Sequence, residues 1–188
     1  MILRALLVLC LTGASMAAQA SFDIDQLMSE LARHKGGRAT FVETRTLAML
    51  DKPLQSSGEM RYLPPDRLEK RTLAPREETV VLDKDTLSVE RDQRRMTINV
   101  ASRPEAQAFV ESVRSTLSGN RQALERHYRL ELSGVAAKWS LVLVPVDAAV
   151  ASLLQRITVT GQGNQVRRIE YLQADGDRSE LRIEPISE

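Results

Sequence analysis

The segment SSGEMRYLPPDRLEKRTLAPREETVVLDKDTLSVERDQRRMTINV, residues 56–100, decides the fold of this chain. In residues 56–63, Gly58, Met60 and Tyr62 alternate with charged residues, which is the period of a strand with one apolar face. Turns that contain Pro or Asp separate the following short runs of β-forming residues. The pattern predicts successive antiparallel strands at 67–73, 79–82, 87–91 and 95–100.

Similar runs flank this segment on both sides. Residues 39–50 precede it, and runs at 128–133, 139–144, 157–160, 166–172 and 179–184 follow it. Short strands at regular spacing, with turn residues between them, predict an antiparallel meander. Few of these strands are apolar throughout, so we expect one face of the sheet to contact solvent.

A first amphipathic helix is predicted before the strands. Asp23 and Gln26 have the spacing of a capping box, and Leu27 and Leu31 recur at helical spacing on one face. The glycine pair at 36–37 is expected to end this helix.

A second helix interrupts the strands after residue 100. Ser102 and Glu105 have the spacing of another capping box, and the apolar stripe that follows is Phe109, Val113 and Leu117. The stripe stops at Gly119, and we expect Asn120 to cap a short further helix through His127. Residues 147–155 fit either a short helix or an irregular crossing.

The N-terminus reads as a cleavable signal peptide covering residues 1–20. Arg4 precedes the apolar run 5–11, and Ala18-Gln19-Ala20 is an A-x-A cleavage signature. We therefore expect export to the periplasm, cleavage after Ala20, and a single domain at 21–188. Cys10 follows Leu9, a bulky residue where a lipid-anchor signal needs a small one, so we interpret Cys10 as part of the apolar run.

Composition excludes several classes of function. The chain has 26 Lys and Arg against 25 Asp and Glu, a balance that argues against a nucleic-acid protein. It contains no nucleophile elbow, zinc-protease motif or phosphate-binding loop, and the D-x-D pairs Asp83/Asp85 and Asp175/Asp177 straddle turns. We expect no enzyme, no metal and no cofactor, although a hydrolase with a distant carboxylate pair stays open.

The helices are expected to cover the apolar face of the sheet. The space between them is then either filled by side chains as an ordinary core, or under-filled and able to hold an apolar ligand. Periodicity does not separate these two cases.

Several runs resemble the LolA family, the periplasmic carriers of outer-membrane lipoproteins. They extend over nearly the whole chain after residue 21, in order: TFVE (40–43), SSGEM (56–60), PPDRL (64–68), VVLDKDTL (80–87), LQRITV (154–159), IEY (169–171), DGD (175–177) and SEL (179–181). The resemblance implies an α+β fold in which an unclosed antiparallel barrel is covered by a lid of amphipathic helices. It also implies an acyl-chain cavity between the two.

The resemblance further implies a monomeric carrier that binds the acyl chains of a lipoprotein or another lipid. Such a carrier takes its cargo from an inner-membrane donor complex to an outer-membrane acceptor, with only transient membrane contact. The expected lining residues are Met60, Tyr62, Leu68, Val80, Met96 and Ile98 from the sheet, and Leu27, Leu31, Phe109, Val113 and Leu117 from the lid.

The chain departs from the family pattern in places, which indicates a divergent member. Pro64 stands where the family has an Arg that holds the lid closed, with Arg61 or Arg67 as substitutes, and Lys70 stands where an aromatic residue is expected. The cargo is therefore either a particular lipoprotein or a different lipid. The alternative function is a periplasmic lipid- or lipoprotein-sensing module without a transport role. Sensors of this fold carry a further C-terminal domain, and this chain stops at Glu188, so we favour the carrier.

Overall fold

The computed structural model describes residues 22–186, and the predicted signal peptide lies outside these residues. Eleven antiparallel strands form one sheet in the order β6-β5-β4-β3-β2-β1-β11-β10-β9-β8-β7. The first half comprises β1 (Gly37–Thr46), β2 (Leu54–Leu63), β3 (Arg67–Ala74), β4 (Glu78–Asp83), β5 (Thr86–Arg91) and β6 (Arg94–Asn99). The second half comprises β7 (Tyr128–Val135), β8 (Lys138–Pro145), β9 (Leu154–Gln162), β10 (Gln165–Gln173) and β11 (Arg178–Pro185).

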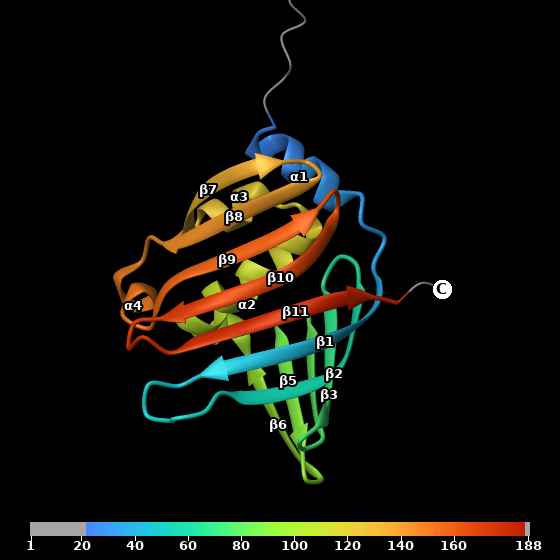
Figure 1. The fold of residues 1–188 in the computed structure, drawn as a ribbon, viewed down its shortest axis with the longest axis vertical. Coiled ribbons are helices and arrows are strands. Elements are labelled where there is room, and N and C mark those ends of the chain that lie inside the picture. Colours follow the sequence, from blue (N-terminus) through green and yellow to red (C-terminus); the bar gives the residue numbers. More distant parts are fainter. Residues whose placement is uncertain (1–21, 187–188) are drawn as a thin grey trace, which may run out of the picture.

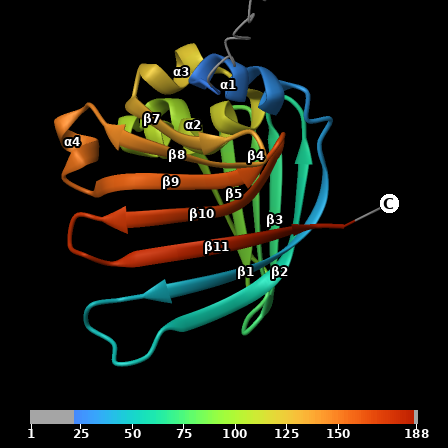
Figure 2. The ribbon, with the colours of Figure 1, turned by 45° about the horizontal axis from the view of Figure 1, so that its top comes forward.

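Each half is a meander of neighbouring strands, as the turn spacing predicts. The halves are joined by β1 and β11, whose register pairs Phe41 with Ile183. The strands β6 and β7 stay at opposite ends of the order, so the barrel is unclosed. Figures 1 and 2 show the sheet strongly bent, with β3 and β5 running in a clearly different direction from β1, β11, β10 and β9.

The helices are α1 (Ile24–Ala32), α2 (Pro104–Ser118), α3 (Arg121–Glu125) and α4 (Ala148–Ala151), with a 3₁₀ turn at Val100–Ser102. In both views α2 lies on the concave side of the bent sheet. This arrangement confirms the predicted α+β half-barrel with a helical lid. Among residues 22–186, no helix has both the length and the apolar character needed to cross a bilayer.

The capping box of α1 is confirmed. The backbone N–H of Gln26 donates to Asp23 Oδ1 at 2.9 Å, and the Gln26 side chain accepts from the Asp23 N–H. The helix ends at Ala32, before the predicted glycine pair, because the N–H of Arg33 already turns back to the carbonyl of Glu30. Gly36, at φ +84°, instead supplies the turn into β1.

The second predicted capping box is wrong. Ser102 belongs to the 3₁₀ turn, where its hydroxyl donates to the carbonyl of Asn99 at 2.8 Å, and α2 begins at Pro104 without a side-chain cap. The predicted end at Gly119 is confirmed, with φ +67°. A Cβ there would lie 2.1 Å from the carbonyl oxygen of Met28, so a glycine lets the end of α2 pack against α1. Asn120 caps α3 as predicted, but that helix stops at Glu125.

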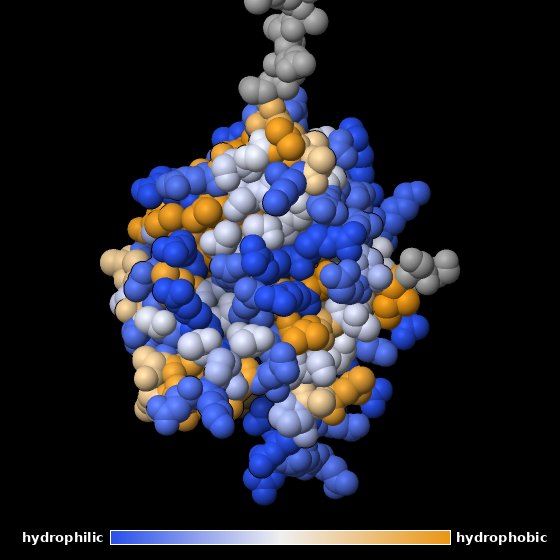
Figure 3. Space-filling view, in the orientation of Figure 1, coloured by the Kyte–Doolittle hydropathy of each residue, from blue (hydrophilic) through white to orange (hydrophobic). Residues whose placement is uncertain are grey.

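The buried apolar residues form two clusters. The larger one joins α1 and α3 to the second half of the sheet and includes Leu27, Leu31, Leu124, Trp139, Leu141, Leu143 and Ile157. The smaller one joins α2 to the first half through Val110, Val100 and Leu82. Hydrophilic residues cover much of the outer face of the sheet seen in Figure 3. On β10, Arg168 pairs with Glu170 and with Glu180 of β11.

Candidate functional site

Two adjoining cavities lie between the concave face of the sheet and α2. Their volumes are about 590 and 570 Å³, each within the range of small-molecule sites. Both are lined by Met60, Leu68, Val113 and Ile169, so they meet at these four side chains. The sequence left open whether this space is filled core or an under-filled cavity, and the structure has the cavity.

The helix α2 turns its apolar stripe toward the cavities. Phe109 is 47% exposed and stacks on Tyr171 with ring centroids 4.9 Å apart, while Val113 and Leu117 are half-buried. Packing in the interior normally buries such residues completely. Here they form an apolar surface that faces empty space, which an apolar ligand can cover.

The polar side of α2 is the buried one. Ser112, Ser115 and Thr116 are each at most 2% exposed, where α2 packs against neighbouring elements. The hydroxyl of Ser112 donates to the carbonyl of Phe109 and that of Thr116 to the carbonyl of Ser112, both at 2.6 Å. These bonds satisfy the buried hydroxyls, so the helix can keep its apolar stripe for the cavity.

Six of the predicted lining residues from the sheet fall in two cross-strand rows on the concave face. The register places Met60, Val80 and Met96 in one row, and Tyr62, Leu68 and Ile98 in the other. Met60 and Leu68 line both cavities, Val80 lines the first and Tyr62 the second. Met96 and Ile98 lie on the edge strand β6, line neither cavity, and Met96 is 56% exposed.

The predicted lid residues divide between cavity and core. Phe109 lines the first cavity, Leu31 and Leu117 line the second, and Val113 lines both. Leu27 lines neither, because it is fully buried in the larger cluster.

Sequence reasoning missed the wall contributed by the second half of the sheet. Ile169, Tyr171 and Leu181 line the first cavity, together with Leu153 from the segment after α4. The alternation of Ile169 and Tyr171 indicates an inward face of β10. Only the pairing of β1 with β11 places that face beside the first half of the sheet, so that both halves line one cavity.

A charged cluster at one end of the first cavity was also missed. Glu43, at 6% exposure, accepts hydrogen bonds from Arg45 Nε at 2.7 Å, Ser179 Oγ at 2.9 Å and Lys70 Nζ. Burial raises the pKa of Glu43, but the hydrogen bond and charge of Lys70, and then those of Arg45, more than offset it. The pKa therefore lies below its usual value, and the carboxylate is ionised at neutral pH.

This shifted pKa predicts how acid affects stability. A carboxyl group whose pKa is lower in the folded state stabilises that state above its unfolded pKa, near 4.5, and the contribution is lost as pH falls through the folded pKa. We expect the free energy of unfolding, measured by urea denaturation, to fall more gently below pH 4.5 in Glu43→Gln than in the natural chain. Glu111, whose pKa is also lowered, keeps part of the slope. A Glu77→Gln control at an exposed site should retain the full slope, and an equally steep fall in Glu43→Gln would contradict the prediction.

Arg61 and Arg67, the expected substitutes for the lid-holding Arg of the family, lie on β2 and β3. Arg67 pairs with Glu69 and Asp83 within the sheet, both at 2.6 Å, and Arg61 is exposed beside the second cavity. A lid-to-sheet contact comes from α2 instead, where Arg114 donates to the carbonyl of Lys84 at 3.2 Å and lies 3.5 Å from Asp85. Within residues 22–186, no three His, Asp or Glu side chains gather in a way that could hold a metal ion.

Comparison with known proteins identifies a family. The sequence profile described as "Outer membrane lipoprotein carrier protein LolA-like" matches residues 16–183. No curated protein matches the sequence.

Solved structures resemble this one weakly. A LolA superfamily protein from Nitrosomonas europaea shares 7% identity at a TM-score of 0.45, covering 89% of this chain and 96% of that one. The lipoprotein LppX from Mycobacterium tuberculosis shares 10% sequence identity at a TM-score of 0.42, and the match covers 86% of this chain and 97% of that one. A chain of the MucA/MucB complex from Pseudomonas aeruginosa shares 14% sequence identity at a TM-score of 0.46, and the match spans 86% of this chain but only 56% of that one.

Proposed function

Because this chain belongs to the LolA-like family of outer membrane lipoprotein carrier proteins, we propose that it binds acyl chains of a lipoprotein or another lipid and carries them across the periplasm. The observation that supports this most is the apolar stripe Phe109, Val113 and Leu117, which faces a cavity rather than a packed core.

The energetics favour a shielded route for such cargo. Burial of an acyl chain gains about 0.8 kcal/mol per CH₂, so a chain of roughly 16 carbons gains on the order of 10 kcal/mol on leaving water. Desorption from a membrane costs about the same, which makes unaided transit slow. A cavity of similar polarity accepts the chain without that cost, and the sheet and α2 supply its walls.

The proposal includes the route of the cargo. A signal peptide at residues 1–20 directs the chain to the periplasm, and residues 21–188 act there as a monomer with transient membrane contact. An inner-membrane complex loads the carrier and an outer-membrane acceptor unloads it. No step in this cycle requires catalysis by the chain itself.

Native mass spectrometry of the protein purified from its own periplasm tests the proposal. We expect a co-purifying lipid or acylated protein that organic solvent releases. A bare protein mass that stays bare after incubation with membrane lipid extract would overturn lipid binding.

A second measurement separates carriage from sensing. Labelled lipid in donor vesicles should reach acceptor vesicles faster when the loaded protein is present, with heat-unfolded protein as the control. Loading without any acceleration of transfer would favour the sensing module over the carrier.

A further inference from the structure

Lys70 interrupts a cross-strand row of apolar side chains on the concave face of the sheet. It pairs with Met60 of β2 on one side and with Val80 of β4 on the other, and both of these line the first cavity. Directly opposed residues share a face of an antiparallel sheet, so Lys70 points inward with them. Its side chain is 22% exposed, and a charge at such a place needs partners.

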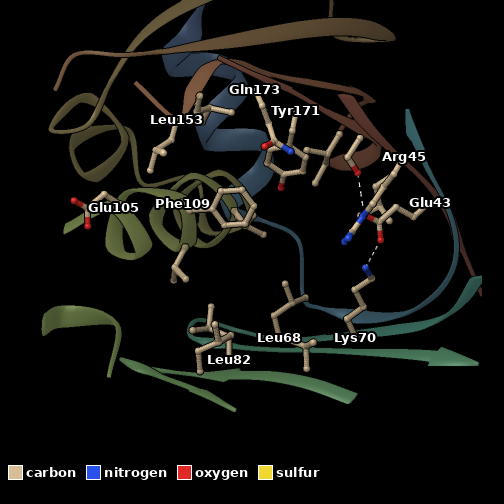
Figure 4. Close-up of a pocket in the computed structure, with 18 of the residues that line it drawn as sticks. Glu43, Arg45, Leu68, Lys70, Leu82, Glu105, Phe109, Leu153, Tyr171 and Gln173 are labelled. Atoms are coloured by element: carbon tan, nitrogen blue, oxygen red, sulfur yellow. Dashed lines mark hydrogen bonds and ion pairs between the residues drawn. The ribbon is translucent and has the colours of Figure 1, made fainter. Parts of the chain in front are cut away.

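The partners of Lys70 come from β1. Its ammonium group donates to Glu43 and lies 4.8 Å from the centroid of the Phe41 ring. Arg45 and Ser179 donate to the same carboxylate. Figure 4 shows Glu43, Arg45 and Lys70 gathered at one end of the cavity, away from Phe109 and Glu105 at the other.

The cluster of Glu43, Arg45 and Lys70 carries one more positive than negative charge. The carboxylate of Glu43 already accepts three hydrogen bonds. The Nη atoms of Arg45 and the remaining N–H groups of Lys70 have no other acceptor among the described residues. The nearby acid Glu78 is paired with Arg91 at 2.6 Å, and Arg178 adds a further cation to the lining. This end of the cavity therefore offers donors and positive charge.

We propose that the cluster of Glu43, Arg45 and Lys70 binds the anionic head, a phosphate or a carboxylate, of an amphiphile whose acyl chain lies along the apolar wall. The inference rests on the proposed lipid-carrying function and names the class of lipid. The chain extends from the cluster past Leu68 toward Phe109, and the head meets donors that the apolar wall does not have.

The cluster sets a preference among lipids with the same acyl chain. A hydrogen bond to a charged group contributes about 1.5–3 kcal/mol, which corresponds to roughly 10- to 100-fold in affinity. The apolar wall contributes equally to charged and uncharged lipids. We expect a preference of that size for the anionic one.

The test compares hexadecyl phosphate with hexadecanol, which share one chain and differ in the phosphate. Both are delivered from cyclodextrin at neutral pH to residues 21–188, and the ratio of their dissociation constants is measured. Inorganic phosphate alone forms a third arm, and we expect it to displace neither lipid because it gains nothing from the apolar wall.

Variants of the cluster should move this ratio in opposite directions. Lys70→Met removes one cation, so the preference should fall to within about threefold of parity, while Lys70→Arg should keep it. Glu43→Gln removes the anion and retains an acceptor for Ser179, so the preference should rise. Lys138→Met, at an exposed lysine on β8, is the matched control and should match the natural chain.

Each outcome bears on a different claim. If neither lipid binds, the proposed function fails. If both bind equally well, or if the preference is unchanged in Lys70→Met and Glu43→Gln, the head-group inference fails and lipid binding stands. Glu43→Gln keeps the test valid should Lys70→Met fail to fold. Displacement of hexadecyl phosphate by inorganic phosphate would show that the cluster is a free-phosphate site and would overturn the proposal that it binds the head of an amphiphile.

Discussion

Replacement of Leu68 by glutamate is expected to abolish lipid loading and to leave the protein folded. Leu68 is half-buried and lines both cavities where they meet. Without ligand, the new carboxylate can remain hydrated in the open cavity. With an acyl chain bound, it loses that water, at a cost of about 3 kcal/mol or more. We therefore expect at least a roughly 100-fold loss of affinity, measured by lipid titration.

A control on the same strand separates the effect of position from that of charge. Leu73 lies five residues further along β3, is 44% exposed and lines neither cavity. Leu73→Glu should load lipid normally and unfold at the temperature of the natural chain. Loss of cooperative unfolding in Leu68→Glu would instead assign Leu68 to the core, and unimpaired loading would exclude it from the binding surface.

The elements that sequence reasoning predicted well are those that local chemistry specifies. The alternation of Gly58, Met60 and Tyr62 identified the inward face of β2, because a strand's side chains change face at every residue. The box of Asp23 and Gln26 identified the start of α1, since both partners lie within one helical turn. The capping box predicted at Ser102 has the same spacing but does not form, because the Ser102 hydroxyl donates within the 3₁₀ turn to the carbonyl of Asn99.

The stripe on α2 shows where this reasoning stops. Periodicity found Phe109, Val113 and Leu117 on one face, but it carries no information on what that face meets. What the stripe faces depends on Gly119, which allows α2 to approach α1, and on the pairing of β1 with β11. These contacts join residues far apart in the chain.

The charged cluster was hidden for the same reason. Lys70 stood out in the sequence as a departure from the family pattern, yet no spacing connects it with Glu43. A signal was present in the strand itself, because Glu43 follows Phe41 by two residues and therefore shares its inward face. A charged residue at such a position predicts a partner. The register places Glu43 opposite Ser56, and Lys70 in the row of Ala39 and Met60, so only the side-chain contact in the folded chain identifies Lys70 as that partner.

Replacement of Trp139 by alanine is expected to have the largest effect on stability. Trp139 is 1% exposed in the larger cluster, and its indole N–H donates to the carbonyl of Gly163 at 2.9 Å. Its cross-strand partner is Gly161, where a Cβ would lie 2.3 Å from the Trp139 ring, so the ring fills the space above that glycine. Truncation leaves a cavity and an unpaired carbonyl, at about 3–5 kcal/mol.

Urea denaturation measures this loss against Met49→Ala, a control that is 87% exposed and should unfold like the natural chain. The melting temperature of Trp139→Ala should fall by about 10 °C, at roughly 2–4 °C per kcal/mol for a domain of this size. Trp139 lines neither cavity, so lipid affinity well below the melting temperature should be unchanged. Trp139→Ala would then lose stability and keep lipid loading, whereas Leu68→Glu would lose loading and stay folded. These opposite results are expected if different residues form the core and line the cavity. A Trp139→Ala protein that unfolds within about 1 kcal/mol of the natural chain, or that loses lipid while folded, would contradict that separation.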